Sequence, residues 1–358
     1  MEKPSLSIYS KSCTAHNAYE VNSGGPMKKL ILRFCLPFIV ALGACTANAA
    51  TYSVGDVFAS IGSGKVAQFD NDLNLIQVLD TGLSGAFTTG SAFDSAGNFY
   101  VTTFGSNVVA KFDTNGVLVN ASFATCDAGS ACESIVFDMA GNFYVGQAEG
   151  TRDILKFDSS GALIDRFDVA TSGRGSDWID LAADQSTLVY TSESSGVSTY
   201  DTAGDVQGAQ FGTTTTSPNF ALRLLGDGGA LVAASGAIDR LDNTGSVIDT
   251  FDFGANDSWF ALNLDPDGDS FWSGDFTTNI LAQFDLATGA VIQSLDLDSI
   301  VGLMGISGID LFGVSVFGEI TEGGGGPPIG DVPLPGALIF LLTGLGGLGA
   351  ASKRRQRA

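Results

Sequence analysis

A repeat of about 43 residues runs through most of the chain and constrains its fold more than any other feature. An apolar residue followed by Asp, a turn and an extended apolar run occurs six times, with 43, 45, 43, 41 and 43 residues between successive aspartates. The six pairs are Phe69-Asp70, Phe112-Asp113, Phe157-Asp158, Tyr200-Asp201, Leu241-Asp242 and Phe284-Asp285. Such spacing indicates one supersecondary unit that is copied and packed against itself.

Each copy has the pattern of strands rather than helices. Segments such as 108–113 and 280–285 are short, rich in β-forming residues and bounded by turn residues. A second mark, Phe-Asp-x-Ala-Gly-Asn-Phe-Tyr-Val, occupies 93–101 and 137–145. Turns such as Asn115-Gly116 supply the positive φ that tight hairpins need. Four strands per copy predict an all-β fold, a β-propeller of four-stranded blades.

The two ends of the repeat region predict how the ring closes. The first copy begins at its second strand, near 56–60, and the last strands, at 305–311 and 314–318, follow the sixth aspartate. A C-terminal strand can therefore complete the N-terminal blade within a propeller spanning 51–320. We expect six blades; seven is the alternative if 304–320 forms a partial blade of its own.

The repeat motifs also resemble those of known propellers. Asp-x-x-Gly-Asn-Phe-Tyr-Val and Lys-Phe-Asp-x-x-Gly are similar to motifs of NHL-like and gluconolactonase-like six-bladed propellers, over roughly 55–318. Gluconolactonase-like propellers bind a divalent ion through Glu, Asn and Asp near the central channel, so the resemblance makes Glu133 and Asp257 weak metal candidates. It implies no cofactor firmly, and calcium is the ion it allows. Asp265–Asp269 has the composition of a calcium loop but falls where other copies have a hairpin turn, which is the interpretation we favour.

The N-terminal region has the pattern of an export signal. Met27 is followed by two lysines, an apolar run over 34–44 and the small-residue site Ala47-Asn48-Ala49. We therefore interpret 1–26 as an upstream start-site artefact and 27–49 as a signal peptide. Cleavage after Ala49 is favoured over the alternative, a lipoprotein signal that would place a lipid on Cys45.

Charge and residue usage of the exported part exclude several function classes. Residues 51–331 contain eight Lys and Arg against thirty-seven Asp and Glu, so the surface repels nucleic acid. The single histidine, His16, lies upstream of the signal, which removes His-based triads and His-ligated metal sites. Cys126 and Cys132 are the two cysteines after the signal, and in an oxidising compartment we expect them to form a disulfide.

The C-terminus carries the most specific signal in the sequence. A Gly/Pro linker at 321–331 precedes Val332-Pro333-Leu334-Pro335, an uncharged stretch at 336–352 and the basic cluster Lys353–Arg357, which includes Arg354 and Arg355. Physics alone predicts a single transmembrane helix with its basic end in the cytoplasm. The order of features in 332–358 resembles the PEP-CTERM class of sorting signals, in its VPLPA-CTERM variant, with Gly336 replacing the usual Ala.

That resemblance implies a destination. It implies recognition by an exosortase-type sorting protease and transient anchoring in the inner membrane. It also implies a final place in the cell envelope, at the surface or outside a Gram-negative cell, often with exopolysaccharide. A plain tail anchor is the alternative.

The loops that enter the first strand of each copy are the candidate binding site, because such loops surround one mouth of a propeller channel. They contain Asp177, Trp178, Asn219 and Trp259. Tryptophan rings beside polar groups could stack on a sugar, although packing between blades is the favoured interpretation of both rings. We expect a binding module without catalysis. The alternatives are a divalent-metal-dependent lactonase-like hydrolase and a purely structural matrix protein.

Overall fold

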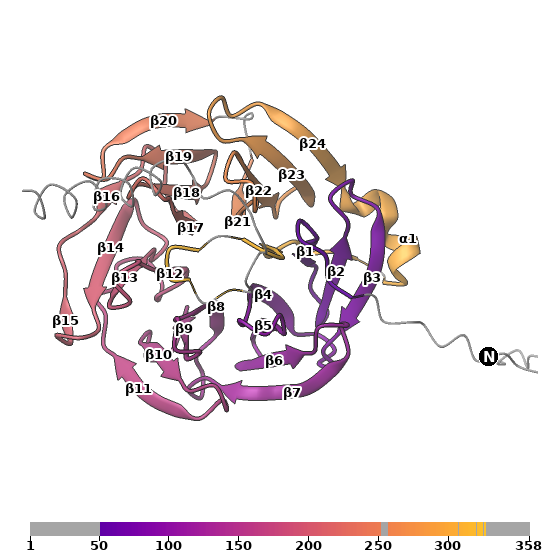
Figure 1. Cartoon of the computed structure of the whole chain (residues 1–358), viewed down its shortest axis with the longest axis horizontal. Helices are drawn as coiled ribbons and strands as arrows, with labels where there is room; N and C mark the ends of the chain where they lie inside the picture. Colours follow the sequence, from indigo (N-terminus) through magenta and orange to yellow (C-terminus); the bar gives the residue numbers. More distant parts are fainter. Residues whose placement is uncertain (1–50, 252–256, 307, 320, 325, 327–358) are drawn as a thin grey trace, which may run out of the picture. The chain divides into compact units, whose positions relative to one another are not determined.

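The structure is a computed structural model that describes residues 51–251, 257–306, 308–319, 321–324 and 326. Its strands form six separate antiparallel sheets, which follow one another around a ring in chain order (Figure 1). The innermost strand of each sheet contacts the innermost strand of the next, and the sixth contacts the first. The described residues therefore form a closed six-bladed β-propeller, which confirms the predicted fold and excludes the seven-bladed alternative.

The blades are numbered in chain order, and each strand is given from the innermost outward. Blade 1 contains β25 (Gly313–Val316), β1 (Val57–Ser60), β2 (Lys65–Phe69) and β3 (Leu75–Asp80). Blade 2 contains β4 (Phe87–Phe93), β5 (Phe99–Phe104), β6 (Val108–Phe112) and β7 (Leu118–Thr125). Blade 3 contains β8 (Cys132–Phe137), β9 (Phe143–Gln147), β10 (Ile154–Phe157) and β11 (Leu163–Phe167).

The other three blades repeat this order, with one addition in blade 4. Blade 4 contains β12 (Ile179–Leu181), β13 (Thr187–Tyr190), β14 (Gly196–Asp201) and β15 (Val206–Gln207), and β16 (Gly212–Thr213) also pairs with β14. Blade 5 contains β17 (Asn219–Leu224), β18 (Ala230–Ala234), β19 (Ala237–Leu241) and β20 (Val247–Phe251). Blade 6 contains β21 (Trp259–Leu264), β22 (Ser270–Asp275), β23 (Ile280–Asp285) and β24 (Val291–Asp296).

The two ends of the propeller meet in blade 1. β25 pairs antiparallel with β1, with Val57 opposite Val316 and Ser60 opposite Gly313. The C-terminal strand thus completes the N-terminal blade, as predicted. The prediction of a strand at 305–311 was wrong: the described residues there follow the short helices η1 (Leu297–Ile300) and α1 (Val301–Met304) and form no strand. Figure 1 shows α1 outside the ring, beside β3 and β24.

The repeated aspartates have a common structural role in the turns. Asp113 Oδ1 accepts hydrogen bonds from the backbone N–H groups of Asn115 and Val117, both at 2.9 Å. Asp158 does the same with Ser160 and Ala162 at 2.8 and 3.0 Å. A short acceptor side chain satisfies turn amides that have no strand partner, which explains why Asp recurs at this position.

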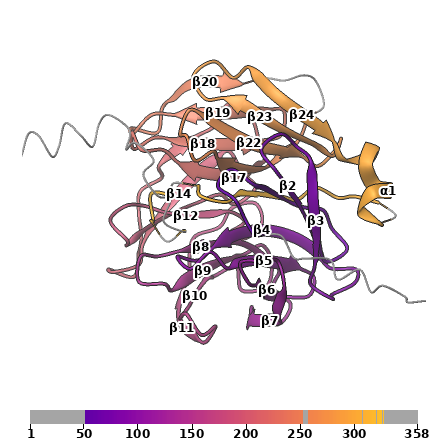
Figure 2. The same cartoon turned by 45° about the vertical axis from the view of Figure 1, so that its right-hand side comes forward.

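The apolar core lies between neighbouring blades rather than inside one of them. One cluster joins Phe58 of β1 to Phe93 of β4, and another joins Tyr144 of β9 to Tyr190 of β13. The innermost strands are largely buried, whereas outer strands such as β11 and β24 are largely exposed. Each sheet therefore covers its neighbours' faces, and the turned view in Figure 2 shows the sheets stacked in this way.

The innermost strands approach so closely that some positions admit no side chain. A Cβ added at Gly313 would lie 1.9 Å from the Thr89 carbonyl oxygen of the next blade. One added at Gly90 would lie 2.6 Å from the Glu133 carbonyl oxygen. Glycine at these two positions allows the backbones of adjacent blades to come into contact.

The segment after β25 packs against the ring for several residues. The Gly323 carbonyl oxygen accepts a 2.8 Å hydrogen bond from the Gln185 side chain of blade 4. Residues 321–324, which the sequence assigned to a linker, therefore belong to the packed domain. The predicted signal peptide and the sorting motif with its helix lie outside the described residues. Within the described ranges no helix is both long and apolar enough to cross a membrane.

Candidate binding site at one end of the ring

The six innermost strands all run in the same direction, so their first residues gather at one end of the ring and their last residues at the other. In β8, Glu133 lies at the first end and Phe137 at the second. In β17, Phe220 and Arg223 are separated in the same way. We call the first end the phenylalanine mouth and the second the far end.

The phenylalanine mouth contains a cavity of about 270 Å³. Six phenylalanines, which we call the phenylalanine wall, form most of its lining: Phe87, Phe104, Phe220, Phe260, Phe276 and Phe312. The other lining residues are polar or charged: Thr89, Glu133, Arg174 and Glu193. An apolar cavity with a few convergent polar groups is the usual form of a small-molecule site.

The phenylalanine wall is continuous across blades 5, 6, 1 and 2. The Phe260 ring lies 4.9 Å from Phe220 and 5.5 Å from Phe312, measured between ring centroids. Phe312 in turn lies 5.5 Å from Phe87 at the rim. Edge and tilted contacts at these distances are favourable between aromatic rings. The wall is therefore a preformed apolar surface.

The opposite side of the cavity, from blades 3 and 4, is charged. Arg174 donates to Glu193 Oε1 at 2.7 Å, its Nη2 lies 3.9 Å from Glu149 Oε1, and its guanidinium lies 4.9 Å over the Phe104 ring. Glu133 is 2% exposed, and its Oε2 atom is buried without a hydrogen-bond partner. These groups and Asp177 form what we call the carboxyl side.

Burial is the main cause of the raised pKa values of two of these acids. It raises the pKa of Glu133 to about 8; Arg174 opposes the shift, and Glu193 and Glu149 add to it. Burial also raises the pKa of Asp177 to about 9, with Glu133 as the next contributor. Within the described residues neither Asp177 oxygen has a hydrogen bond of normal geometry. The nearby Gly175 amide lowers the pKa of Asp177 and so offsets part of the rise that burial causes. Both acids thus favour their neutral form at neutral pH.

The two predicted tryptophans lie behind the mouth rather than in it. Trp178 is 2% exposed and Trp259 is 4% exposed, and both belong to the core cluster of blades 4, 5 and 6. The Trp178 ring lies 6.3 Å from Phe260, on the buried side of the phenylalanine wall. Neither ring offers a face to a sugar, and packing between blades describes both.

The remaining predicted site residues do not come together in the structure. Asn219 is fully buried; its Oδ1 accepts a 2.6 Å hydrogen bond from the Thr214 hydroxyl and its Nδ2 donates to the Gly196 carbonyl oxygen at 3.4 Å, so its amide joins blade 5 to blade 4. Asp257 precedes β21, and its carbonyl oxygen accepts from the Gly236 amide. Among the described residues no group of three acidic, His or Cys side chains is arranged to hold a metal ion. The Cys126 and Cys132 sulfurs lie within bonding distance, with their Cα atoms 6.0 Å apart.

The sequence predicted the position of the phenylalanine mouth but not most of the residues that line it. It identified the strand-entry loops, which place Glu133, Phe220 and Phe260 at the cavity. It missed Phe87 and Phe312, although both lie at the same end of β4 and β25. Strand alternation could not have found the lining residues, because the pairing of β21 with β22 has a register irregularity between Trp259 and Ala261, at the position of Phe260.

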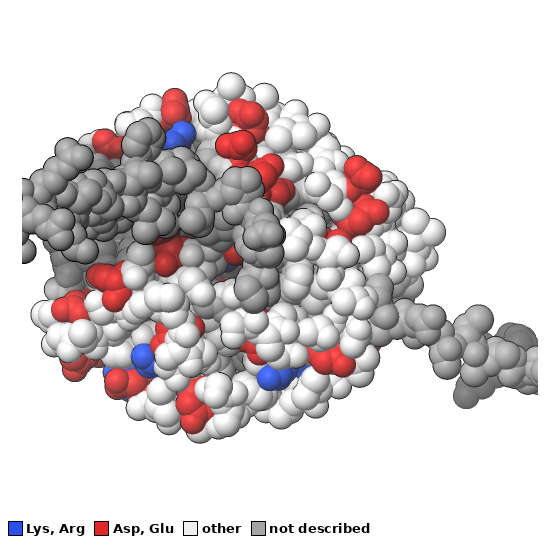
Figure 3. Space-filling view, viewed as in Figure 1, with Lys and Arg blue, Asp and Glu red and all other residues white. Residues whose placement is uncertain are grey.

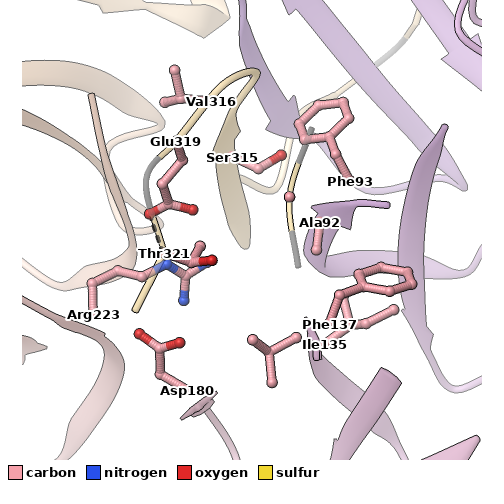
Figure 4. Close-up of a pocket in the computed structure, with 12 residues that line it drawn as sticks. Ala92, Phe93, Ile135, Phe137, Asp180, Arg223, Ser315, Val316, Glu319 and Thr321 are labelled. Carbon is pink, nitrogen blue, oxygen red and sulfur yellow. Dashed lines mark hydrogen bonds and ion pairs between the residues drawn. The ribbon is translucent and has the colours of Figure 1, made fainter. Parts of the chain in front are cut away.

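The far end is closed by the segment that follows β25. Glu319 Oε1 accepts hydrogen bonds from Arg223 Nε at 3.0 Å and from the Leu264 amide at 2.8 Å. Figure 4 shows the Arg223 guanidinium between the carboxylates of Glu319 and Asp180. The small pocket beside this group, of about 30 Å³, has room for little more than a water molecule.

Comparison with known proteins identifies the fold and nothing finer. No protein-family model matches the sequence, and no curated protein matches it. The structure is similar to a propeller in the crystal structure of a nidogen/laminin complex, with a TM-score of 0.58 and 13% identity, over 74% of this chain and 99% of that one. It is also similar to a protein of unknown function from Bacteroides caccae, with a TM-score of 0.54 and 15% identity, over 73% and 98% of the two chains. At these identities the likeness shows a six-bladed β-propeller.

Proposed function

We propose that this protein is an exported, non-catalytic binding module that holds a small ligand, or one residue of a polymer, in the phenylalanine mouth. One observation carries the proposal: a preformed cavity of about 270 Å³ lies at one end of the ring, lined by six phenylalanines and by Glu133, whose buried Oε2 has no hydrogen-bond partner among the described residues. Empty apolar surface of this kind is rare away from interaction sites.

The polar groups of the cavity favour binding over turnover. The Thr89 hydroxyl already contacts Thr102 Oγ1 at 2.9 Å and the Cys132 carbonyl oxygen at 3.3 Å, so it is held by the ring. No Ser, Cys, Lys or His is among the lining residues of the described cavity. What remains are carboxyl groups and one guanidinium, which suit recognition.

The two ends of the chain supply the proposed destination. The signal peptide at 27–49 would export the propeller, and Val332–Pro335 with the following helix and arginines would deliver it to an exosortase-type protease. The described chain passes over the far end before residue 326. An anchor beyond that point would therefore leave the phenylalanine mouth facing away from the membrane.

The acidic exterior fits an extracellular setting and limits the partners. Figure 3 shows acidic side chains spread over the visible face, with few basic ones among them. Such a surface disfavours nucleic acid and suits a hydrated matrix, so we propose exopolysaccharide as the surroundings of the protein. An oxidising compartment would also favour the Cys126–Cys132 disulfide.

Two measurements test this proposal. Mass spectrometry of the protein released by its native host should give an N-terminus at Ala50 and no peptide beyond Pro335. Recovery of the intact tail in the membrane fraction would instead indicate a plain tail anchor.

The second measurement is a binding screen. Calorimetry or tryptophan fluorescence with oligosaccharides and small apolar compounds should find a ligand that the Phe276→Ala variant loses. The equally half-buried Phe317→Ala variant, outside the cavity, should bind as wild type does. Equal binding by both variants, or no ligand in the screen, would reject the cavity as the site.

A lactonase-like hydrolase is the second candidate, because Glu133 and Asp177 are buried acids at the mouth with raised pKa values. Such groups are typical of catalytic acids. Calcium-dependent hydrolysis of a sugar lactone that disappears in Glu133→Gln would replace our proposal with this one.

A further inference from the structure

The phenylalanine mouth has two unlike sides, and together they restrict the chemistry of its occupant. The phenylalanine wall presents ring faces and edges, whereas the carboxyl side presents acids around a single cation, Arg174. An apolar ligand would match the first side only. A ligand with an apolar body and one polar group would match both.

The carboxyl side has more negative than positive groups. Glu133, Asp177, Glu149 and Glu193 are the four acids that interact with one another and with Arg174. Arg174 is already engaged by Glu193 at 2.7 Å and lies over the Phe104 ring. Among the described residues Glu133 shares the charge of Arg174 with the other three acids, while the ion pairs of Arg174 go to Glu193 and Glu149. Four acids around one cation favour a positive ligand.

The buried oxygen of Glu133 also favours a ligand that can donate a hydrogen bond. A buried polar atom without a hydrogen bond costs free energy, and the cost is larger for an ionised group. Within the described residues Glu133 Oε2 has no donor. A ligand that brings a charged N–H or ammonium group would remove that cost and stabilise the ionised carboxylate, whereas an anionic acceptor could pair only with the protonated carboxyl.

The phenylalanine wall favours the same class of ligand. The faces of aromatic rings attract cations through their quadrupole, most strongly where water is excluded. The wall lines the same cavity as Glu133. An ammonium group could thus contact the carboxyl on one side while its apolar body lies among the rings.

We propose that the phenylalanine mouth binds a small organic cation, an ammonium group carried on an apolar or aromatic body, with Glu133 as its counter-ion. This inference rests on the proposed binding function and names the ligand class. Glu133 and the phenylalanine wall are the specificity-determining groups, and Arg174 holds the other acids in place.

The proposal also fixes the direction of the pH dependence. The ligand pairs with the ionised form of Glu133, whose pKa is about 8 in the unliganded protein. Affinity for a permanently charged cation should therefore rise as pH increases through this value. Asp177 titrates in the same range and acts in the same direction, whereas Arg174 stays charged.

The test uses the full exported chain and three probes that share a phenyl ring: phenethylammonium, 2-phenylethanol and 3-phenylpropionate. Calorimetry should show the ammonium binding about tenfold or more tighter than the alcohol, and the propionate weakest. Benzyltrimethylammonium, whose charge does not titrate, should bind about tenfold tighter at about pH 9 than at about pH 6. Glu133→Gln should remove most of both differences.

Each other outcome has a definite meaning. Equal binding of ammonium and alcohol, unchanged in Glu133→Gln, would overturn the charge preference and leave the cavity as a binding site. Preferred binding of propionate would assign recognition to Arg174 and overturn the inference. No binding of any phenyl probe, when other compounds of the earlier screen bind, would also reject this inference alone. Should Glu133→Gln not fold, the wild-type probe order and pH dependence decide.

Discussion

Removing the Glu319 carboxylate perturbs the far end of the ring at one defined point. The Arg223 and Glu319 side chains are 5% and 9% exposed, and their ion pair joins blade 5 to the segment after β25. Glu319 also accepts from the Leu264 amide of blade 6. The Glu319→Ala variant would leave the Arg223 guanidinium buried with the Leu222 carbonyl at 3.1 Å and the nearby Asp180 carboxyl.

The expected cost follows from that loss. Removing one member of a buried ion pair typically destabilises a protein by about 3–5 kcal/mol, because the other charge stays buried. For a domain of this size that corresponds to a fall in Tm of about 6 °C or more. The pair itself is less favourable than its geometry suggests: burial raises the pKa of Glu319 despite Arg223, so the carboxylate is poorly compensated. The double variant Arg223→Met/Glu319→Met, in which the buried Asp180 can take up a proton because burial raises its pKa, should therefore lie within about 2 kcal/mol of wild type.

Urea denaturation of wild type, Arg223→Met, Glu319→Met and the Arg223→Met/Glu319→Met double variant gives the coupling energy directly. We expect each single variant to be clearly less stable than the double variant. A loss below about 1 kcal/mol in Glu319→Ala, or additive single effects, would refute the argument that this pair fastens the C-terminal segment to the ring.

Two further predictions concern ring closure and the mouth. Gly313→Ala should lower the free energy of unfolding by about 3 kcal/mol, because its Cβ would meet the Thr89 carbonyl. Gly308→Ala is the control: a Cβ there has nothing within 4 Å, so the cost should be well under 1 kcal/mol. Equal costs in denaturant titrations would contradict the close contact at Gly313. Since burial raises the pKa of Glu133 from 4.5 to about 8, its contribution to stability is complete at low pH and is lost as pH rises through that value. The free energy of unfolding of Glu133→Gln, relative to that of wild type, should therefore rise by up to about 1.4 kcal/mol per pH unit between about pH 5 and pH 8. A difference that does not change with pH would show that Glu133 keeps an ordinary pKa.

The fold could be predicted because its turns repeat a local interaction. Asp113, Asp158 and Asp242 each accept from two backbone amides two and four residues on, so the sequence has to keep Asp at a fixed place in each blade. Asp201 and Asp285 accept from the amides two and three residues on. Six Asp turns at blade-length spacing leave few alternatives to a ring. Local signals do not identify the closing strand, and β25 was distinguished from 305–311 by its pairing with β1.

The sequence predicts at which end of the ring the site lies but not which side chains line it. The strand-entry loops marked the correct end of the ring because inner strands all run the same way. Which side chain faces the cavity depends on strand register and on the blade behind it, so Trp178 and Phe260, at equivalent places, differ in role. The Arg223–Glu319 pair joins residues 96 positions apart, and no local pattern announces it.

Blocking the phenylalanine mouth tests the central claim most directly. Phe87 is 40% exposed at its rim, and Val119 is 57% exposed on β7, the outer strand of the same blade. The Phe87→Cys and Val119→Cys variants, each labelled with a bulky maleimide, should differ in calorimetry with whichever phenyl probe binds wild type tightest. We predict that the label at position 87 weakens binding about tenfold or more and the label at position 119 leaves it unchanged. Undiminished binding to the protein labelled at position 87 would contradict the account.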